Sequence, residues 1–186
     1  MKQIKKLLFV ATAILFANAS IAQSKKTVMV GGAAMYPSKN IVENAVNSKD
    51  HTTLVAAVKA AGLVATLQSA GPFTVFAPTN NAFAMLPTGT VDNLLMAENK
   101  PALTTVLTYH VVAGRYSSAD LAKLIKAGNG TAVLKTVAGK NLKIMMKGKK
   151  IAIMDEKGGV AYVTIKDVNQ SNGVIHVVDH VLLPKM

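Results

Sequence analysis

Two histidines late in the sequence have a spacing that can bind metal. His176 and His180 are four residues apart, and on a helix this spacing places two imidazoles one turn apart, as in zinc sites. The run Val174–Val178 follows Asn172-Gly173 and is apolar and β-branched, which predicts a strand instead. Four residues of a strand span about 13 Å, too far for two ligands that each bind zinc at about 2.1 Å. We therefore predict structural histidines and no metal site.

The other candidates for catalysis lack the partners that catalysis needs. His110 has neither a nucleophile motif nor an acidic group to orient it, so we expect it to form hydrogen bonds near a strand end. His51 is expected at the surface. The only adjacent acidic pair, Asp155-Glu156, falls in a predicted hairpin turn, where carboxylates are solvated. The sequence has no Gly-x-Ser-x-Gly elbow, no phosphate-binding glycine loop and no cysteine, which predicts a protein that is not an enzyme and binds no cofactor.

Lysines are concentrated in residues 131–166, which hold eight lysines against two acidic residues. Alternation with period two predicts one apolar and one exposed face over residues 142–147. The apolar face holds Leu142, Ile144 and Met146, and the exposed face holds Lys143, Met145 and Lys147. Lys149 opens the next predicted strand. This face either keeps the sheet soluble or binds anionic polysaccharide, lipid headgroups or an acidic protein. Nucleic acid is disfavoured, because the stretch has no arginine and only Tyr162 as an aromatic residue.

The first 22 residues have the three parts of a secretory signal peptide. Three lysines precede the apolar run 7–16, and the small-residue stretch 17–22 follows it. The apolar run is shorter than the roughly 20 residues that span a bilayer. We predict a signal peptide over 1–22 and a secreted or periplasmic protein that is not membrane-spanning after cleavage. Cleavage lowers the formal net charge from +12 to +9, because the three lysines are removed.

The rest of the chain predicts one α+β domain. Residues 23–37 are polar and contain glycine and proline, so we expect a flexible lead-in to a domain over 38–186. Apolar residues three and four apart predict short helices in the first half, with strands at 73–77 and 110–112 between them. Alternating runs separated by glycine turns predict an antiparallel meander over 131–183. Helices gathered before strands favour the α+β class.

Three blocks of the sequence resemble the signatures of one family. Gly71-Pro-Phe-Thr-Val-Phe-Ala-Pro-Thr-Asn-Asn-Ala-Phe83 is similar to the first block of fasciclin (FAS1) domains. Tyr109-His-Val-Val112 resembles their central Tyr-His element, and Asn172-Gly-Val-Ile-His-Val-Val-Asp-His-Val-Leu-Leu-Pro184 resembles their closing block. The resemblance covers residues 38–184. It implies a single-domain secreted bacterial type, with an antiparallel β wedge or sandwich and several short helices packed against it.

Most residues of these blocks are expected to have structural roles. Phe76 and Phe83 supply buried apolar area, Pro78 ends the first strand, and Thr79 or Asn80 caps the following helix. The full set of motif residues is Thr74, Phe76, Pro78, Thr79, Asn80, Phe83, Gly173, His176 and Asp179, the last of which is expected to accept backbone hydrogen bonds.

The resemblance also implies adhesion through extracellular protein or carbohydrate contacts. We expect a monomer that attaches to a cell surface or matrix, with an extracellular protein, a polysaccharide or an anionic surface as partner and no nucleic acid. The candidate contact residues are Lys143, Lys147 and Lys149, joined by Tyr109 and His110 through their likeness to an element implicated in integrin binding in animal relatives. The alternative is a periplasmic binding module for a small or anionic ligand, which a polar pocket near His110 or His176 would favour.

Overall fold

A seven-stranded sheet carries the fold in the computed structural model, which describes residues 26–185. Its strands in chain order are β3 (Phe73–Pro78), β4 (Val111–Ala113), β5 (Thr131–Lys135), β6 (Asn141–Lys147), β7 (Lys150–Met154), β8 (Val160–Gln170) and β9 (Gly173–Val178). Their order in space is β4-β3-β9-β8-β7-β6-β5. The signal peptide predicted over residues 1–22 lies outside the described residues.

The two ends of this sheet meet. Val112 in β4 bridges to Thr136, just beyond β5, although the two strands stand at opposite ends of the order. The amide of Val137 also donates to the carbonyl of Val111 at 2.7 Å. Register shifts in β8 between Val163 and Val168 bend the sheet toward this closure. The sheet therefore curls into a near-barrel, which agrees with the predicted α+β class.

Helix α7 (Ser118–Ala127) packs against β5 and β6 of the curled sheet. Ser117 and Asp120 cap it reciprocally, as their spacing suggests for a capping box. Leu121 and Ile125 on its buried face join the main apolar core with alternating strand residues such as Leu142 and Ile144. The predicted alternation stops short of Met146, which is 41% exposed because it lies next to the turn that follows β6.

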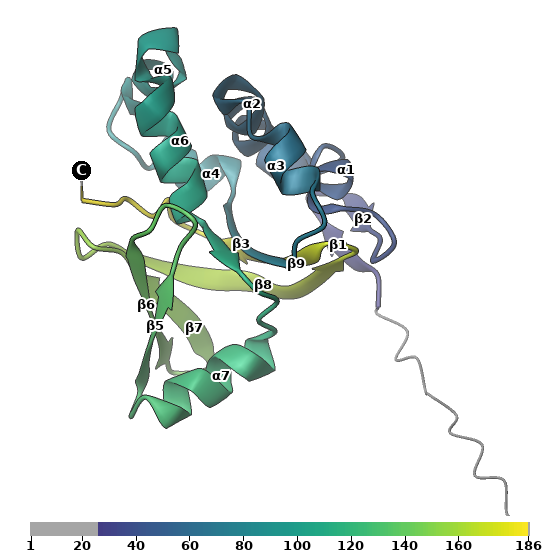
Figure 1. Cartoon of the computed structure of the whole chain (residues 1–186), viewed down its shortest axis with the longest axis vertical. Coiled ribbons are helices and arrows are strands. Elements are labelled where there is room, and N and C mark those ends of the chain that lie inside the picture. Colours follow the sequence, from purple (N-terminus) through teal and green to yellow (C-terminus); the bar gives the residue numbers. More distant parts are fainter. Residues whose placement is uncertain (1–25, 186) are drawn as a thin grey trace, which may run out of the picture.

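The remaining helices form a layer on the other side of β8 and β9 (Figure 1). They are α1 (Ile41–Ala45), the 3-10 turn η1 (Lys49–His51), α2 (Thr52–Ala61), α3 (Val64–Gln68), α4 (Asn80–Ala84), α5 (Thr90–Leu95), the 3-10 turn η2 (Ala97–Asn99) and α6 (Lys100–Tyr109). Helices α2 and α6 pack on each other through a small apolar cluster that includes Ala57, Val58 and Leu103. A further cluster lies between α1 and the strands β3 and β9.

The segment expected to be a flexible lead-in is folded where it is described. Val28–Val30 (β1) and Ala33–Met35 (β2) form an antiparallel hairpin. Gly31 and Gly32 both have positive φ, which is what a two-residue hairpin turn with the correct twist requires. Val30 and Met35 are buried against the sheet. The expectation for residues 23–37 rested on their polarity, and the short apolar alternation on both sides of the glycines outweighs it.

Strand β9 also departs from the expected meander. It pairs antiparallel with β8 on one side and parallel with β3 on the other. All six of its residues are buried. Full burial explains why its sequence is apolar on both faces, with His176 as the one exception, rather than alternating. The two outer signature blocks of the sequence are therefore neighbouring strands in space.

Asn172, in the turn before β9, ties the helical layer to the sheet. Its side-chain oxygen accepts from the amide of Ile41 at 3.0 Å. Its side-chain nitrogen donates to the carbonyls of Leu67 and Ser69, each at 2.8 Å. One buried side chain thus satisfies backbone groups of α1 and of the end of α3.

We predict that Asn172→Ala lowers the free energy of unfolding by about 3 kcal/mol, because three hydrogen bonds to backbone groups are lost together. Asn99→Ala is the matched control. Asn99 is partly exposed and its side chain bonds only to Asn93, six residues earlier in the chain and at the surface, so its removal should change stability by no more than about 0.5 kcal/mol. Urea unfolding of the three proteins measures both values, and equal stabilities would contradict the assignment.

Candidate functional site

The first and last signature blocks meet around a stacked pair of rings. Phe76 in β3 stands opposite His176 in β9, and the ring centroids are 5.9 Å apart. His176 donates from Nε2 to the carbonyl of Tyr116 at 2.9 Å and accepts at Nδ1 from the amide of Asp167. Burial lowers the pKa of His176, so its ring is neutral at pH 7. Both nitrogens are engaged, which leaves no lone pair for a ligand.

The Tyr-His element is buried as well. The exposed fractions of Tyr109 and His110 are 0% and 3%. His110 donates from Nδ1 to the carbonyl of Val106 at 2.8 Å, and its Nε2 accepts from the amide of Leu182 at 2.9 Å. The hydroxyl of Tyr109 donates to the carbonyl of Asn141 at 2.8 Å, and burial raises its pKa to about 12. Both side chains therefore fasten separate segments to the core and present no surface to a partner.

The other motif residues hold the ends of these elements. Thr79 caps α4, and Asn80 accepts from the amide of Thr53 at 3.0 Å and donates to the carbonyl of Lys49 at 2.8 Å. Thr74 donates to the carbonyl of Gly114 at 2.7 Å. Pro78 is the last residue of β3, and Phe83 is buried. A side chain at Gly173 would collide with the carbonyl of Phe73. The carboxylate of Asp179 accepts from the amide of Tyr162 at 2.7 Å.

Two residues of this framework are not identified by sequence reasoning. Arg115, the only arginine in the chain, donates to the carbonyls of Gln170, Ser171 and Gly173 and so clamps the turn before β9. Asp155 is buried and accepts from the amides of Lys157, Gly159 and Leu183 rather than standing in solvent. The presence of one arginine among many lysines is the sequence signal that could have indicated the structural role of Arg115.

The lysines of the sheet half are largely unpaired. Within residues 26–185, only Lys140 among those of segment 131–166 has a carboxylate within 4.0 Å, that of Glu156 at 3.9 Å. The exposed lysines of this segment are Lys135, Lys143, Lys147, Lys149, Lys150, Lys157 and Lys166. Three of them crowd the turn between β6 and β7, where Lys147 stands directly opposite Lys150 and Lys149 lies between them. We call residues 147–150 the hairpin tip.

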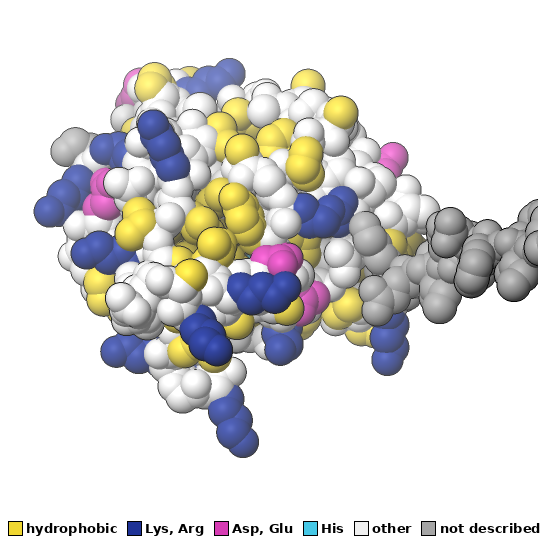
Figure 2. Space-filling model, turned by 60° about the horizontal axis from the view of Figure 1, so that its bottom comes forward, with side chains coloured by type: hydrophobic (Ala, Val, Ile, Leu, Met, Phe, Trp, Pro, Cys, Tyr) yellow, Lys and Arg dark blue, Asp and Glu magenta, His cyan; other side chains and the backbone are white. Residues whose placement is uncertain are grey.

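A groove of about 580 Å³ lies between α7 and the sheet next to the hairpin tip. Ile151 and Val163 contribute apolar surface to it, and Lys149, Lys150 and Lys166 contribute cations. In the view of Figure 2, cationic side chains are spread around a central group of hydrophobic ones rather than gathered in one place. The three lysines predicted to act together are also divided, because Lys143 and Lys147 lie on the strand and Lys149 in the turn.

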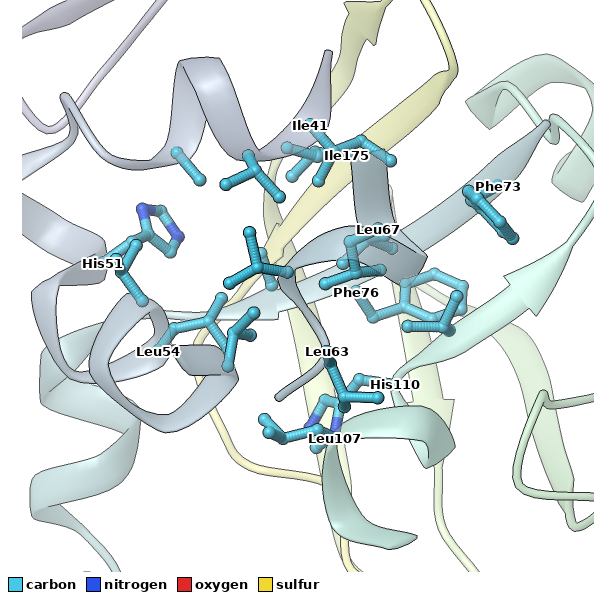
Figure 3. Close-up of a pocket in the computed structure, with 18 of the residues that line it drawn as sticks. Ile41, His51, Leu54, Leu63, Leu67, Phe73, Phe76, Leu107, His110 and Ile175 are labelled. Carbon is cyan, nitrogen blue, oxygen red and sulfur yellow. The ribbon is translucent and has the colours of Figure 1, made fainter. Parts of the chain in front are cut away.

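An apolar cavity of about 100 Å³ lies between the helical layer and the sheet. Figure 3 shows His51 and His110 at different sides of it, with leucines from α2, α3 and α6 among the residues between them. His51, expected at the surface, is only 3% exposed. It is buried because the turn η1 folds its side chain back toward Ser48, whose hydroxyl lies 2.9 Å from Nδ1. The cavity is not the polar pocket that would have favoured the ligand-binding alternative.

The Fasciclin domain pattern matches residues 49–184 of this chain. The chain belongs to the fasciclin family. Protein sll1483 of Synechocystis is 45% identical over 91% of this chain and 87% of its own length. The immunogenic protein MPB70 of Mycobacterium bovis is 38% identical over 74% of this chain and 65% of its own length. In both bacterial relatives the similarity covers most of this fasciclin chain.

The fold agrees with this membership. The structure of a FAS1 domain pair from the insect cell adhesion molecule Fasciclin I superposes with a TM-score of 0.69 and 20% identity. The match covers 78% of this chain and 51% of that one. No helix within residues 26–185 is long and apolar enough to cross a membrane. In the same span, no three acidic or histidine side chains gather where they could hold a metal ion.

We predict that His110 makes the stability of this fasciclin domain depend on pH. Burial lowers its pKa from 6.5 to about 4, although the carbonyl of Val106 and the charge of Asp155 oppose the shift. As the pH falls, His110 therefore binds a proton near pH 6.5 in the unfolded chain but only near pH 4 in the folded chain. The contribution is fully present above pH 6.5 and lost as the pH falls to 4, by up to about 3 kcal/mol.

Urea unfolding at several pH values between about 4.5 and 8, in steps of about one pH unit, measures this dependence. His110→Asn should be less stable at pH 8 and should lose less stability on acidification than the wild type. His180→Asn, at an exposed position, is the control and should follow the wild-type curve. An unchanged slope in His110→Asn would show that other groups, such as the buried His51 and His176, carry the whole effect.

Proposed function

We propose that this chain is a secreted or periplasmic, non-enzymatic fasciclin protein that attaches to a cell surface or matrix. The signal peptide predicted over residues 1–22 supports export. The cell adhesion molecule whose FAS1 pair shares the fold supports the attachment role. The domain is proposed to span 38–186, with the hairpin β1–β2 packed against it. Neither the proposed export nor the proposed attachment requires a cofactor.

The hairpin tip carries this proposal. Lys147 and Lys150 are a directly opposed cross-strand pair of like charges, which destabilises a sheet unless something of opposite charge lies nearby. No described carboxylate lies within 4.0 Å of them or of Lys149. A polyanion laid across the tip would relieve this repulsion. The partner class that fits is an anionic polysaccharide, because its repeated charges can meet several lysines at once.

We assign the contact to Lys143, Lys147 and Lys149 and not to Tyr109 and His110. Contact with a partner through the latter pair would require the core to open, since both side chains are buried and hydrogen-bonded. The lysines can be bound or released without any change of fold. An exposed cationic surface also binds in a salt-sensitive manner, because solvent ions screen it.

We predict that reversing the charge of Lys143, Lys147 and Lys149 to Glu weakens binding to an immobilised uronic-acid polysaccharide by about tenfold or more at low ionic strength. The wild type should itself lose binding as salt is added. Surface plasmon resonance gives the affinities, and circular dichroism with thermal unfolding checks that the fold is intact. Absence of salt-sensitive binding by the wild type would contradict the proposed partner class.

The matched control is the triple charge reversal of Lys49, Lys59 and Lys100. These lysines are exposed on the helical layer, and their reversal changes the net charge by the same amount. This variant should keep most of the wild-type affinity. An equal loss in both variants would show that total charge, and not the tip, controls binding.

A further inference from the structure

The apolar cavity contains an unused hydrogen-bonding group. Nε2 of His51 is the one buried side-chain nitrogen or oxygen in residues 26–185 that has no hydrogen-bond partner. Its ring is nine-tenths or more buried and lines the cavity (Figure 3). Buried polar groups are nearly always paired in folded proteins, so an unpaired one indicates a site with a missing partner.

The carbonyl of Ala77 acts on the His51 ring as an acceptor but does not meet hydrogen-bond geometry at Nε2. Neither His110 nor Thr108 supplies the partner. Both nitrogens of His110, the other histidine on the cavity wall, are engaged with Val106 and Leu182. The hydroxyl of Thr108 is turned back to the carbonyl of Thr104 at 2.7 Å. Burial lowers the pKa of His51, which keeps the ring uncharged at pH 7, while the carbonyl of Ala77 and the charge of Asp50 act in the opposite direction.

Water is a poor occupant of this space. A buried water needs about two to four polar partners, and engineered cavities with apolar walls stay dry. The walls here are almost entirely aliphatic and aromatic, from Ile41, Leu54, Val58, Leu67 and Phe73 among others. A ligand with an apolar body and one polar group matches them better.

The volume and the single nitrogen define the ligand class. A dry cavity of roughly 150 Å³ holds benzene, so about 100 Å³ admits one ring after small side-chain movements and excludes an acyl chain or fused rings. We propose that the cavity binds a neutral single-ring molecule with a hydroxyl group, of the phenol class, whose hydroxyl bonds to Nε2 of His51. A hydroxyl suits either tautomer of the ring, because it both donates and accepts.

A route to the surface exists at the edge of the cavity. Lys59 and Val137, both exposed, line it together with the buried residues. Val137 follows β5 and Lys59 lies on α2, so the opening is between the helical layer and the closed edge of the sheet. The inference does not depend on the attachment function, because the lysines of the hairpin tip are not among the residues that line the cavity.

The test is a titration of the purified protein with phenol and with benzene, followed by NMR of the Met35 and Ile41 methyl groups at the cavity wall. We expect saturable shifts of these methyls with both compounds and about fivefold tighter binding of phenol, the effect of one net hydrogen bond. His51→Leu should bind both compounds equally. His51→Asn, which can keep a polar atom beside Ser48 but removes Nε2, should do the same and serves if the leucine variant does not fold.

The control is His180→Leu, which removes an exposed histidine and should keep the phenol preference. The variant with Lys143, Lys147 and Lys149 reversed to Glu should also bind phenol like the wild type. Failure of the cavity proposal is therefore separable from failure of the attachment proposal. Absence of saturable shifts, shifts that map away from Met35 and Ile41, or a phenol preference that survives both His51 substitutions would each overturn the assignment.

Discussion

The parallel pairing of β3 with β9 is the constraint on which the rest of the molecule depends. The last strand of the chain inserts between β3 and β8 and is buried along its whole length. Until it is in place, β3 and β4 pair with the rest of the sheet only at its closure, through the bridge at Val112 and the hydrogen bond from Val137 to Val111. The domain therefore closes by a contact between residues about a hundred positions apart, a slow kind of contact because a long loop must be ordered first.

Polar side chains secure this central pair from several directions. Asn172 joins the turn before β9 to the helices, and Arg115 clamps the same turn from the segment after β4. His110 and Asp155 each accept an amide of the C-terminal segment, at Leu182 and Leu183. Asn172 and His110 of the signature blocks thus form a hydrogen-bonding framework together with Arg115 and Asp155, which lie outside the blocks. A framework of this kind fixes the fold and leaves the exposed strand faces and turns free to carry different binding chemistry.

Patterns that act locally could be predicted from the sequence, and contacts made across the fold could not. The cap of α7 by Ser117 and Asp120 and the burial of Leu142 and Ile144 depend on neighbours in the chain. The parallel partner of β9, the burial of His51 and the clamp by Arg115 depend on segments far away in sequence. The cavity is a property of packing between layers, for which no residue pattern is diagnostic. The lysine cluster was visible in the sequence, but its division between strand and turn was not.

The cavity and the unpaired nitrogen of His51 both lower the stability of the domain when no ligand fills the cavity. A void of about 100 Å³ costs about 2 kcal/mol at the sensitivity measured for core cavities. An unsatisfied buried nitrogen adds about 1–3 kcal/mol. Together they are a large part of the 5–15 kcal/mol or so that stabilises a typical domain. A ligand that fills the space and bonds to His51 removes both costs at once. Because the layers already stand apart at this position, it can do so without disturbing the β3–β9 pair, so binding here stabilises the fold that the central strands define.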